Sequence, residues 1–186
     1  VVSPTMEGSR PLLVEVQALL TPATYGSPVR RASGLDQNRL NLLTAVLGRR
    51  AGIALGSHDV FANLAGGLAV SEPGLDLPLA LALASSLRDR PIAAGTVAIG
   101  EVGLLGELRG VAALERRLLE AARLGFTRAI VPRARRDRAM PDVPGVRIDV
   151  AETLRDAIER ALSEPAGRSD AVPAMLPGSV SLSPIE

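Results

Sequence analysis

The sequence predicts a single α/β domain, and three observations support that prediction. Its 186 residues suit one well-packed core and are too few for two ordinary domains. Several short segments alternate apolar and polar residues, which is typical of half-buried strands. Longer segments between them repeat apolar residues every three or four positions, as amphipathic helices do. Strands interleaved with helices along one chain favour the α/β class.

Four strands are expected from the alternating segments and from short apolar runs. They lie at residues 12–20, 59–65, 96–103 and 128–131. Between the first two, residues 21–33 contain Pro22, Gly26 and Pro28, which favour turns. We therefore expect a loop or a short hairpin there.

Four helices are expected between and after these strands. They lie at residues 36–50, 77–88, 111–124 and from 149 or 151 to 162. Asp36 can cap the first helix, and Gly52 lies just past its end. Asp76 can cap the second helix, which is apolar on all sides. A helix without a polar face is expected to be buried inside the domain.

The two ends of the chain differ in composition from its middle. Residues 1–10 contain Ser, Thr, Gly and Pro, and we expect a strand or loop remnant of a connection to an upstream domain. Residues 11–162 are expected to form the domain itself. Residues 163–186 are rich in Pro, Ser, Gly and Ala without periodicity, which predicts a disordered tail.

Composition excludes several kinds of site. The formal net charge is only +1, so a basic surface for nucleic acid must be local. Cysteine is absent and histidine occurs once, so a zinc site or a Cys/His nucleophile pair lacks its usual ligands. All 21 basic residues are arginine, which excludes a Ser–Lys dyad and a P-loop lysine. No apolar stretch is long enough to span a membrane and no signal peptide opens the sequence, so a cytoplasmic location is expected.

Several motifs together resemble a known family. Residues 100–109 (GEVGLLGELR), the helix at 113–124, Gly125-Phe126 and the strand at 129–132 resemble the final third of the Lon protease domain. Upstream, residues 28–31 (PVRR), residues 34–40 (GLDQNRL), His58-Asp59-Val60 and Gly66-Gly67 resemble RadA/Sms proteins specifically. The resemblance covers roughly residues 8 to 150, and it identifies the chain as a C-terminal Lon-protease-like domain of that family.

The resemblance implies a fold and a setting. The fold is that of the second domain of small-ribosomal-subunit protein five, an α/β (α+β) arrangement of a mixed sheet with packed helices. In RadA/Sms proteins this domain follows a zinc finger and a RecA-like ATPase, and the whole protein is a ring-shaped, DNA-dependent helicase or translocase that extends heteroduplex during recombinational repair. ATP, magnesium and zinc are therefore implied for the upstream domains, and no cofactor for this chain.

The resemblance also argues against peptidase activity. Proteolytic Lon domains pair a serine with a lysine that activates its hydroxyl. Gly74 stands at the serine position, and Glu115 at the position assigned to the lysine. Because both members of the dyad are missing, no catalytic residue is expected in this chain.

Arginines are the candidates for contact with DNA. Arg30 and Arg31 beside Arg39 can form a patch that binds phosphates; alternatively, Arg39 pairs with Asp36 or with a neighbouring subunit. Arg50, eleven positions after Arg39, falls on nearly the same helix face. A second group, either a further DNA contact or an ordinary solvated loop, is Arg133, Arg135 and Arg136.

Two other polar pairs are interpreted as structural and not catalytic. His58 and Asp59 are neighbours on a strand and point to opposite faces, which makes a general-base pair awkward. Asp76 and Glu101 can be read as paired carboxylates, but capping and ordinary polar contacts are favoured.

Three functions are weighed. The first is a scaffold that supports a ring, expected to be hexameric, and presents arginines to single-stranded or branched DNA. The second is a protein-interaction module that docks a RecA-type recombinase without touching DNA. The third, a Lon-type peptidase with an unrecognised nucleophile, is disfavoured because no Ser or Thr stands where the fold would need it. No membrane partner is expected.

Overall fold

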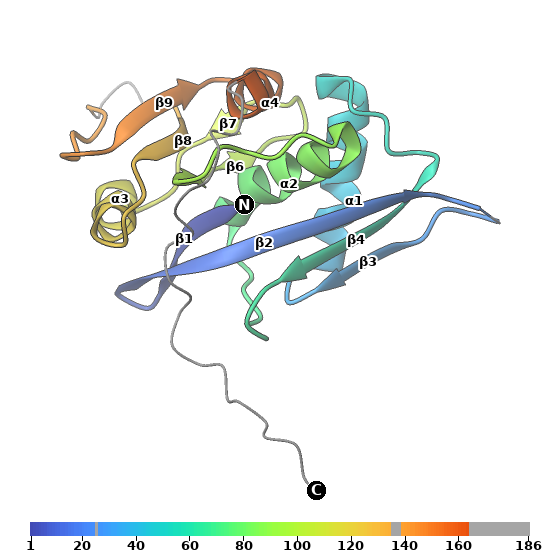
Figure 1. Ribbon diagram of the computed structural model, residues 1–186, viewed down its shortest axis with the longest axis horizontal. Coiled ribbons are helices and arrows are strands. Elements are labelled where there is room, and N and C mark those ends of the chain that lie inside the picture. The colour runs from blue at the N-terminus through green and yellow to red at the C-terminus, as the bar shows by residue number, and fades with distance from the viewer. Residues whose placement is uncertain (25, 135–138, 164–186) are drawn as a thin grey trace, which may run out of the picture.

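A seven-stranded mixed sheet organises the chain in the computed structural model, which describes residues 1–24, 26–134 and 139–163 (Figure 1). The strand order is β3-β4-β2-β1-β5-β8-β9. Strands β1, β2 and β4 pair antiparallel, while β3 on β4, and β5, β8 and β9 beyond β1, pair parallel. The bounds are β1 Val2–Glu7, β2 Arg10–Pro22, β3 Arg30–Ser33, β4 His58–Leu64, β5 Thr96–Ala98, β8 Arg128–Pro132 and β9 Arg147–Ala151. A separate hairpin pairs β6 Glu101–Val102 with β7 Leu108–Arg109.

The helices are α1 Gln37–Val46, α2 Asp76–Arg88, α3 Leu114–Arg123 and α4 Leu154–Ser163. A π-helical turn, η1 Leu47–Ala51, extends α1, and a 3₁₀ turn, η2 Pro73–Leu75, precedes α2. The carboxylate of Asp36 accepts a hydrogen bond of 2.7 Å from the backbone N–H of Arg39, which confirms the cap of α1. Gly52 adopts a left-handed conformation with φ of 71°, as expected of a residue that ends a helix.

Helix α2 lies at the centre of the domain. Its residues from Leu77 to Ala84 are all buried, because it packs on β2 and also contacts α1 and α4. Because α2 is surrounded by other elements, it needs no polar face, and the prediction that this helix is buried inside the domain is confirmed. The expected cap is wrong, however: Leu75 holds the cap position without a side-chain hydrogen bond, and Asp76 is the first residue of the helix.

Two apolar clusters fill the interior. The larger one joins α1, α2 and α4 to β2 and β4, with Leu40, Leu47, Leu81 and Ile158 among its buried members. The smaller one lies where α3 meets β5 and β8, around Leu118. The fold class predicted from the sequence, a mixed sheet with packed helices, is confirmed.

Several segments differ from the expectation. Residues 2–7, expected as a remnant outside a domain that starts at residue 11, form β1, which lies inside the sheet between β2 and β5. The expected strand at 96–103 divides into β5 and β6, while β3 lies within the expected loop and β9 was not expected. The tail predicted for residues 163–186 lies outside the described residues from 164 onward.

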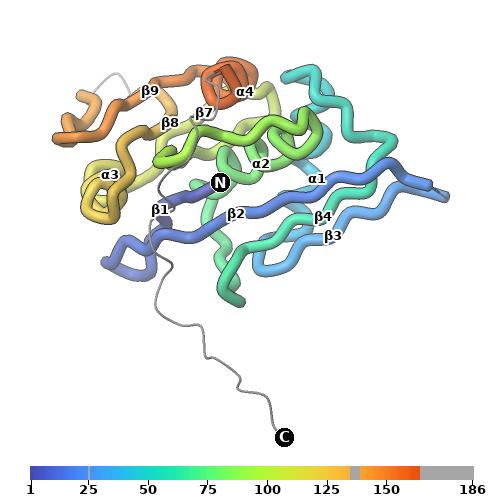
Figure 2. The backbone as a smooth tube through the Cα atoms, in the orientation of Figure 1, coloured from blue at the N-terminus to red at the C-terminus, as the bar shows by residue number. Residues whose placement is uncertain are grey.

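The β3–β4–β2 part of the sheet has helices α1 and α2 on one face only (Figure 2), and a side chain binds its outer edge. Gln17, Leu19, Arg31 and Phe61 are exposed on the open face, because α1 and α2 pack on the opposite one. At the outer edge of β3, the side-chain amide of Gln37 accepts a hydrogen bond of 2.9 Å from Ala32 N–H and donates one of 3.2 Å to the carbonyl of Arg30. Within the described residues, no helix is both long and apolar enough to cross a membrane.

Candidate functional site

The site that the sequence points to is the segment that leads into α2. Gly74 in η2 accepts a hydrogen bond of 3.0 Å from Gly100 N–H, and Leu77 N–H donates one of 3.0 Å to the carbonyl of Gly100. These bonds hold the start of α2 against the bend between β5 and β6. A cavity of about 190 Å³ opens beside this segment, with Leu35, Arg39, Val70, Asp76 and Glu101 among its lining residues.

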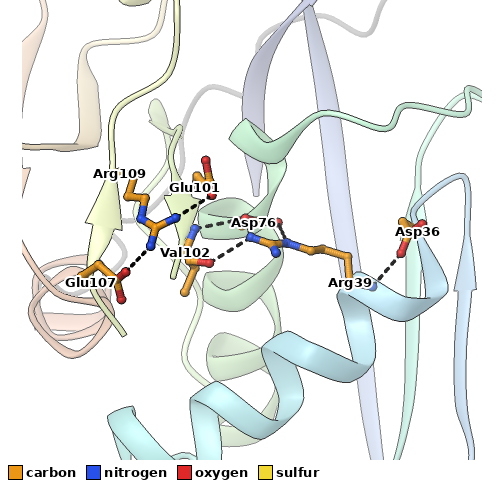
Figure 3. A network of polar contacts seen from close by, with 7 residues as sticks. All are labelled: Asp36, Arg39, Asp76, Glu101, Val102, Glu107 and Arg109. Atoms are coloured by element: carbon orange, nitrogen blue, oxygen red, sulfur yellow. Dashed lines mark hydrogen bonds and ion pairs between the residues drawn. The ribbon is translucent and has the colours of Figure 1, made fainter. Parts of the chain in front are cut away.

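An ion pair between Arg39 and Asp76 closes one side of the segment (Figure 3). Arg39 Nε donates to Asp76 Oδ1 at 2.6 Å, and its Nη2 donates both to Asp76 Oδ2 and, at 2.9 Å, to the carbonyl of Val102. The N–H of Val102 returns a hydrogen bond of 3.0 Å to Asp76 Oδ2. The pair therefore ties α1 and α2 to the β6–β7 hairpin.

Burial sets the electrostatics of this pair. Removal from water raises the pKa of Asp76 above its ordinary value, although hydrogen bonds from Arg39 and Val102 oppose the rise. The hydrogen bond to Asp76 raises the pKa of Arg39. The guanidinium of Arg39 thus does not pair with Asp36, one of the partners expected for it: Asp36 binds the backbone of Arg39, and the guanidinium binds Asp76.

A second ion pair, between Arg117 and Glu72, closes the other side. Arg117 is 3% exposed, and besides Glu72 it donates to the carbonyls of Ala112 at 2.9 Å and Pro4 at 3.0 Å. Glu72 also accepts from the hydroxyl of Thr5 and from Met6 N–H. Burial raises the pKa of Glu72, but the bonds from Arg117 and Thr5 outweigh it, so that pKa lies below its ordinary value.

The two positions of the missing dyad do not face each other. A methyl group built at Gly74 would lie 3.3 Å from Glu72 Oε1 and 3.3 Å from Val111 Cγ1, which leaves little room for a side chain. Glu115 is exposed in the first turn of α3. The α3 side chain that reaches the Gly74 segment is Arg117, two positions further on, through Glu72.

The arrangement offers poor groups for acid–base chemistry. A guanidinium stays protonated in proteins, so Arg117 cannot take a proton from a nucleophile as an amine can. The hydroxyl of Thr5 does meet the carboxylate of Glu72, but Thr5 is buried in β1 and the lowered pKa makes Glu72 a weak base. The contacts of Glu72 with Arg117 and with Thr5 therefore stabilise the fold.

The other polar pairs also have structural partners. Glu101 binds Arg109 at 3.3 Å, and Arg109 binds Glu107 at 2.6 Å, so Asp76 and Glu101 do not share a proton as a catalytic pair would (Figure 3). Asp59 accepts from Val29 N–H at 2.8 Å rather than from the neighbouring imidazole of His58. In the described residues no group of three His, Cys, Asp or Glu side chains could hold a metal ion.

The structure does not bring the predicted arginines together. Arg30 and Arg31 are neighbours on β3 and point to opposite faces, with Arg30 half-buried and Arg31 exposed. Arg39 is occupied by Asp76, and Arg133 pairs with Glu152 at 2.6 Å. Arg50 lies exposed at the other end of the α1–η1 helix. Arg135 and Arg136 lie outside the described residues.

Sequence reasoning missed Arg117, although one signal was present. Arg117 falls on the apolar stripe of α3 with Leu114 and Ala121, three and four positions away. A charged residue on a buried stripe needs a buried partner. That partner, Glu72, lies 45 positions earlier, so no local pattern links the two.

Comparison with known proteins gives the family. Residues 38–135, more than half of the chain, match the family model described as subunit ChlI of Mg-chelatase. The DNA repair protein RadA of Bacillus subtilis (strain 168) is 44% identical over 161 residues, which cover 84% of this chain and 35% of that protein. RadA of Escherichia coli (strain K12) is 49% identical over 152 residues, 82% of this chain and 33% of that protein. The chain belongs to this family, and within it to the RadA proteins.

A third RadA protein extends the comparison to another organism. RadA of Synechocystis sp. (strain ATCC 27184 / PCC 6803 / Kazusa) is 50% identical over 127 residues, 68% of this chain and 25% of that protein. The chain spans about a third of the length of the first relatives it matches. It is therefore part of a DNA repair protein of the RadA family.

Proposed function

We propose that this chain is a non-catalytic domain that supports assembly of a RadA-type ring and contributes to its DNA binding. One observation carries the proposal: arginine–carboxylate pairs hold both sides of the segment where a Lon-type protease would have its nucleophile. Those pairs connect α1, α2, α3, β1 and β6. A site built in this way stabilises a scaffold and offers no free base.

The setting of the domain belongs to the same proposal. We expect the whole protein to form a hexameric ring, to hydrolyse ATP with magnesium, to carry a zinc finger, and to migrate DNA branches together with a RecA-type recombinase in the cytoplasm. None of these groups is assigned to residues of this chain. The ligand we propose for the domain is single-stranded or branched DNA.

Two measurements on this chain test the proposal. Sedimentation velocity with a labelled single-stranded oligonucleotide, at low and near-physiological salt, should give a complex that dissociates as salt rises. Incubation with labelled casein should give no turnover. The variant Thr5→Val removes the only hydroxyl bonded to Glu72 in the described residues. If the unmodified chain degrades casein and this variant does not, the non-catalytic assignment is contradicted.

A second function, a protein-interaction module, is favoured by the open face of the β3–β4–β2 sheet. Leu19 is 58% exposed there and Phe61 39% exposed, and they are paired across β2 and β4. Exposed apolar side chains on an uncovered sheet are typical of surfaces that bind other proteins. The test is co-sedimentation with a RecA-type recombinase in the absence of DNA: binding that Phe61→Ser abolishes would favour this function.

A further inference from the structure

Strand β9 is the last strand at one end of the seven-stranded sheet (Figure 1). On its inner side it pairs parallel with β8, where Arg147 N–H donates to the carbonyl of Thr127 at 2.8 Å. Backbone groups of successive residues alternate between the two sides of a strand. The N–H and carbonyl groups of Ile148 and Val150 therefore point away from the sheet.

This outer edge of β9 is open. In the part of the chain that the structure describes, no strand pairs with β9 there, and no side chain binds the backbone of Ile148 or Val150. The edge ends at Glu152, whose carbonyl accepts a hydrogen bond of 2.9 Å from Leu108 N–H in the β6–β7 hairpin. A strand added to β9 is thus confined to residues 146–150.

The charged side chains of β9 lie on its α4 side. Asp149 Oδ2 accepts hydrogen bonds from Arg128 Nε at 2.7 Å and from Arg147 Nη2 at 3.2 Å, and Arg128 also binds the carbonyl of Arg160 in α4. Among the described residues, nothing donates to Asp149 Oδ1. The side chain of Arg147 is 55% exposed. Each β9 therefore carries one cation and one anion, two positions apart on the same face.

This spacing is self-complementary in an antiparallel pair of two β9 strands. If the pair is centred on Ile148, Arg147 of each copy lies directly opposite Asp149 of the other. Side chains opposite each other in antiparallel strands have Cβ atoms about 5 Å apart, and opposite charges in such positions attract. The same arrangement therefore forms two equivalent ion pairs.

The backbone and the other face fit the same register. The two Ile148 residues exchange N–H and carbonyl bonds, and Val150 N–H of each copy reaches the Val146 carbonyl of the other. Val146 N–H keeps its own bond of 3.1 Å to the carbonyl of Val143. Ile148 meets Ile148, and Val150 meets Val146, beside the smaller apolar cluster on which Val146 and Ile148 already pack.

Other registers bring like charges together. If Ile148 of one copy is paired with Val150 of the other, Asp149 lies opposite Asp149. A parallel pair in register places Arg147 beside Arg147. Like charges directly opposite each other destabilise a strand pair, so the charges of β9 select the antiparallel register centred on Ile148.

We infer that the outer edge of β9 binds β9 of a second copy of this chain, antiparallel and centred on Ile148. The contact has two-fold symmetry and closes on itself, so it does not build a ring. Where the domain is part of a ring, it joins copies that belong to two rings. The inference is therefore independent of the function proposed above. The contact is shorter than a standard interface, and a dissociation constant of about 0.1–1 mM is expected.

The test combines sedimentation equilibrium with amide hydrogen exchange followed by NMR, both on the unmodified chain from about 10 μM to about 2 mM. The apparent mass should rise towards that of a dimer. The amides of Ile148 and Val150 should exchange about threefold more slowly at the highest concentration, because the fraction of monomer falls by about that factor. The amide of Arg147 is the internal control: it is bonded to Thr127 and should exchange at the same rate throughout.

Two variants sharpen the test. Arg147→Glu places a carboxylate opposite Asp149 of the second copy and should weaken dimerisation at least about tenfold. Arg31→Glu is the matched control, with the same change of charge at an exposed residue of β3, and it should dimerise as the unmodified chain does. Ile148→Pro removes the central N–H, which makes no bond within the described residues, and should abolish dimerisation.

Three results would overturn the inference. One is a monomer up to about 2 mM whose Ile148 amide exchanges equally fast at all concentrations. Another is a dimer in which exchange of that amide does not change, since the interface then lies elsewhere. The third is slow exchange at every concentration, which would mean that the chain covers this edge itself. The exchange measurement needs no variant and stays decisive if a variant loses structure, and no outcome bears on the oligonucleotide or casein measurements.

Discussion

The arginines of α1 and α3 that bind the segment leading into α2 differ from the arginines of η1 in whether they have a carboxylate partner. Arg39 and Arg117 each bind a carboxylate and at least one backbone carbonyl, and they connect elements distant in the sequence. Arg49 and Arg50 are exposed, and their guanidiniums have no carboxylate partner in the described part of the chain. The first two arginines stabilise the fold, whereas the guanidiniums of the other two are accessible to a ligand. The difference lies in whether a carboxylate is within hydrogen-bond distance, and not in the position of the arginine in the sequence.

The largest expected effect is on stability, in Arg117→Met. Loss of this guanidinium leaves Glu72 charged and without its ion partner, and leaves the Pro4 carbonyl without that hydrogen bond. Breaking a buried pair in this way costs about 3–5 kcal/mol. Urea denaturation measures the loss; the double variant Arg117→Met/Glu72→Gln, which removes both charges, should recover part of it. A loss of unfolding free energy below about 1 kcal/mol would show that the Arg117–Glu72 pair contributes no more than an exposed ion pair does.

Arg39→Met should cost less, about 2 kcal/mol, because its side chain is 32% exposed and solvent screens the pair. The variant leaves Asp76 buried without its cation, so its pKa rises further. A carboxyl group with a raised folded-state pKa stabilises the fold when it is protonated, and stability falls as pH rises through that pKa. The variant should therefore lose less stability at about pH 5 than at about pH 7. Equal losses at both pH values would show that Asp76 is not the group left unpaired.

Glu72→Gln leaves the buried Arg117 without its ion partner, but the amide keeps the size of the side chain and its oxygen can still accept hydrogen bonds. The expected loss near neutral pH is therefore about 1.5 kcal/mol, smaller than for either arginine variant. The folded-state pKa of Glu72 is lowered, so its contribution is present above the unfolded-state value and is lost as pH falls through the folded one. The melting temperature of the variant should depend less on pH below about pH 5 than that of the unmodified chain. Parallel acid profiles would contradict the assigned pKa direction.

The smallest effect is expected for Arg31→Glu. Its guanidinium has no partner among the described residues, and surface substitutions of this kind change stability by at most about 0.5 kcal/mol. Thermal unfolding monitored by circular dichroism is sufficient to measure it. A loss comparable to that of Arg39→Met would show that exposure alone does not separate the two groups of arginines.

Local signals in the sequence predicted the helices well. Asp36 and Gly52 marked the limits of the α1–η1 helix, and the apolar residues of α2 predicted its burial. Both features depend on neighbours within a few positions. The family motifs worked in the same way, as continuous runs such as residues 34–40 and 100–109.

Features that depend on distant partners could not be predicted. Strand β9 is different, because Arg147 and Asp149 alternate with Ile148 and Val150, a local strand pattern that was overlooked; only its place beside β8 required the structure. Asp76 satisfied the rule for a helix cap, yet its strongest partner, Arg39, lies 37 positions away. The hydrogen bond from the Arg155 guanidinium to the Arg50 carbonyl joins residues 105 positions apart.

The amide of Gln37 has a consequence for how copies of this domain can meet. An edge strand with free N–H and carbonyl groups is a template for a strand of another chain, and therefore for domain swapping and fibril growth. The Ala32 N–H and the Arg30 carbonyl are two of the groups that such a strand would need on β3, and Gln37 already binds both. Copies of this domain that meet at high concentration are thus hindered from merging their sheets through these two groups of β3.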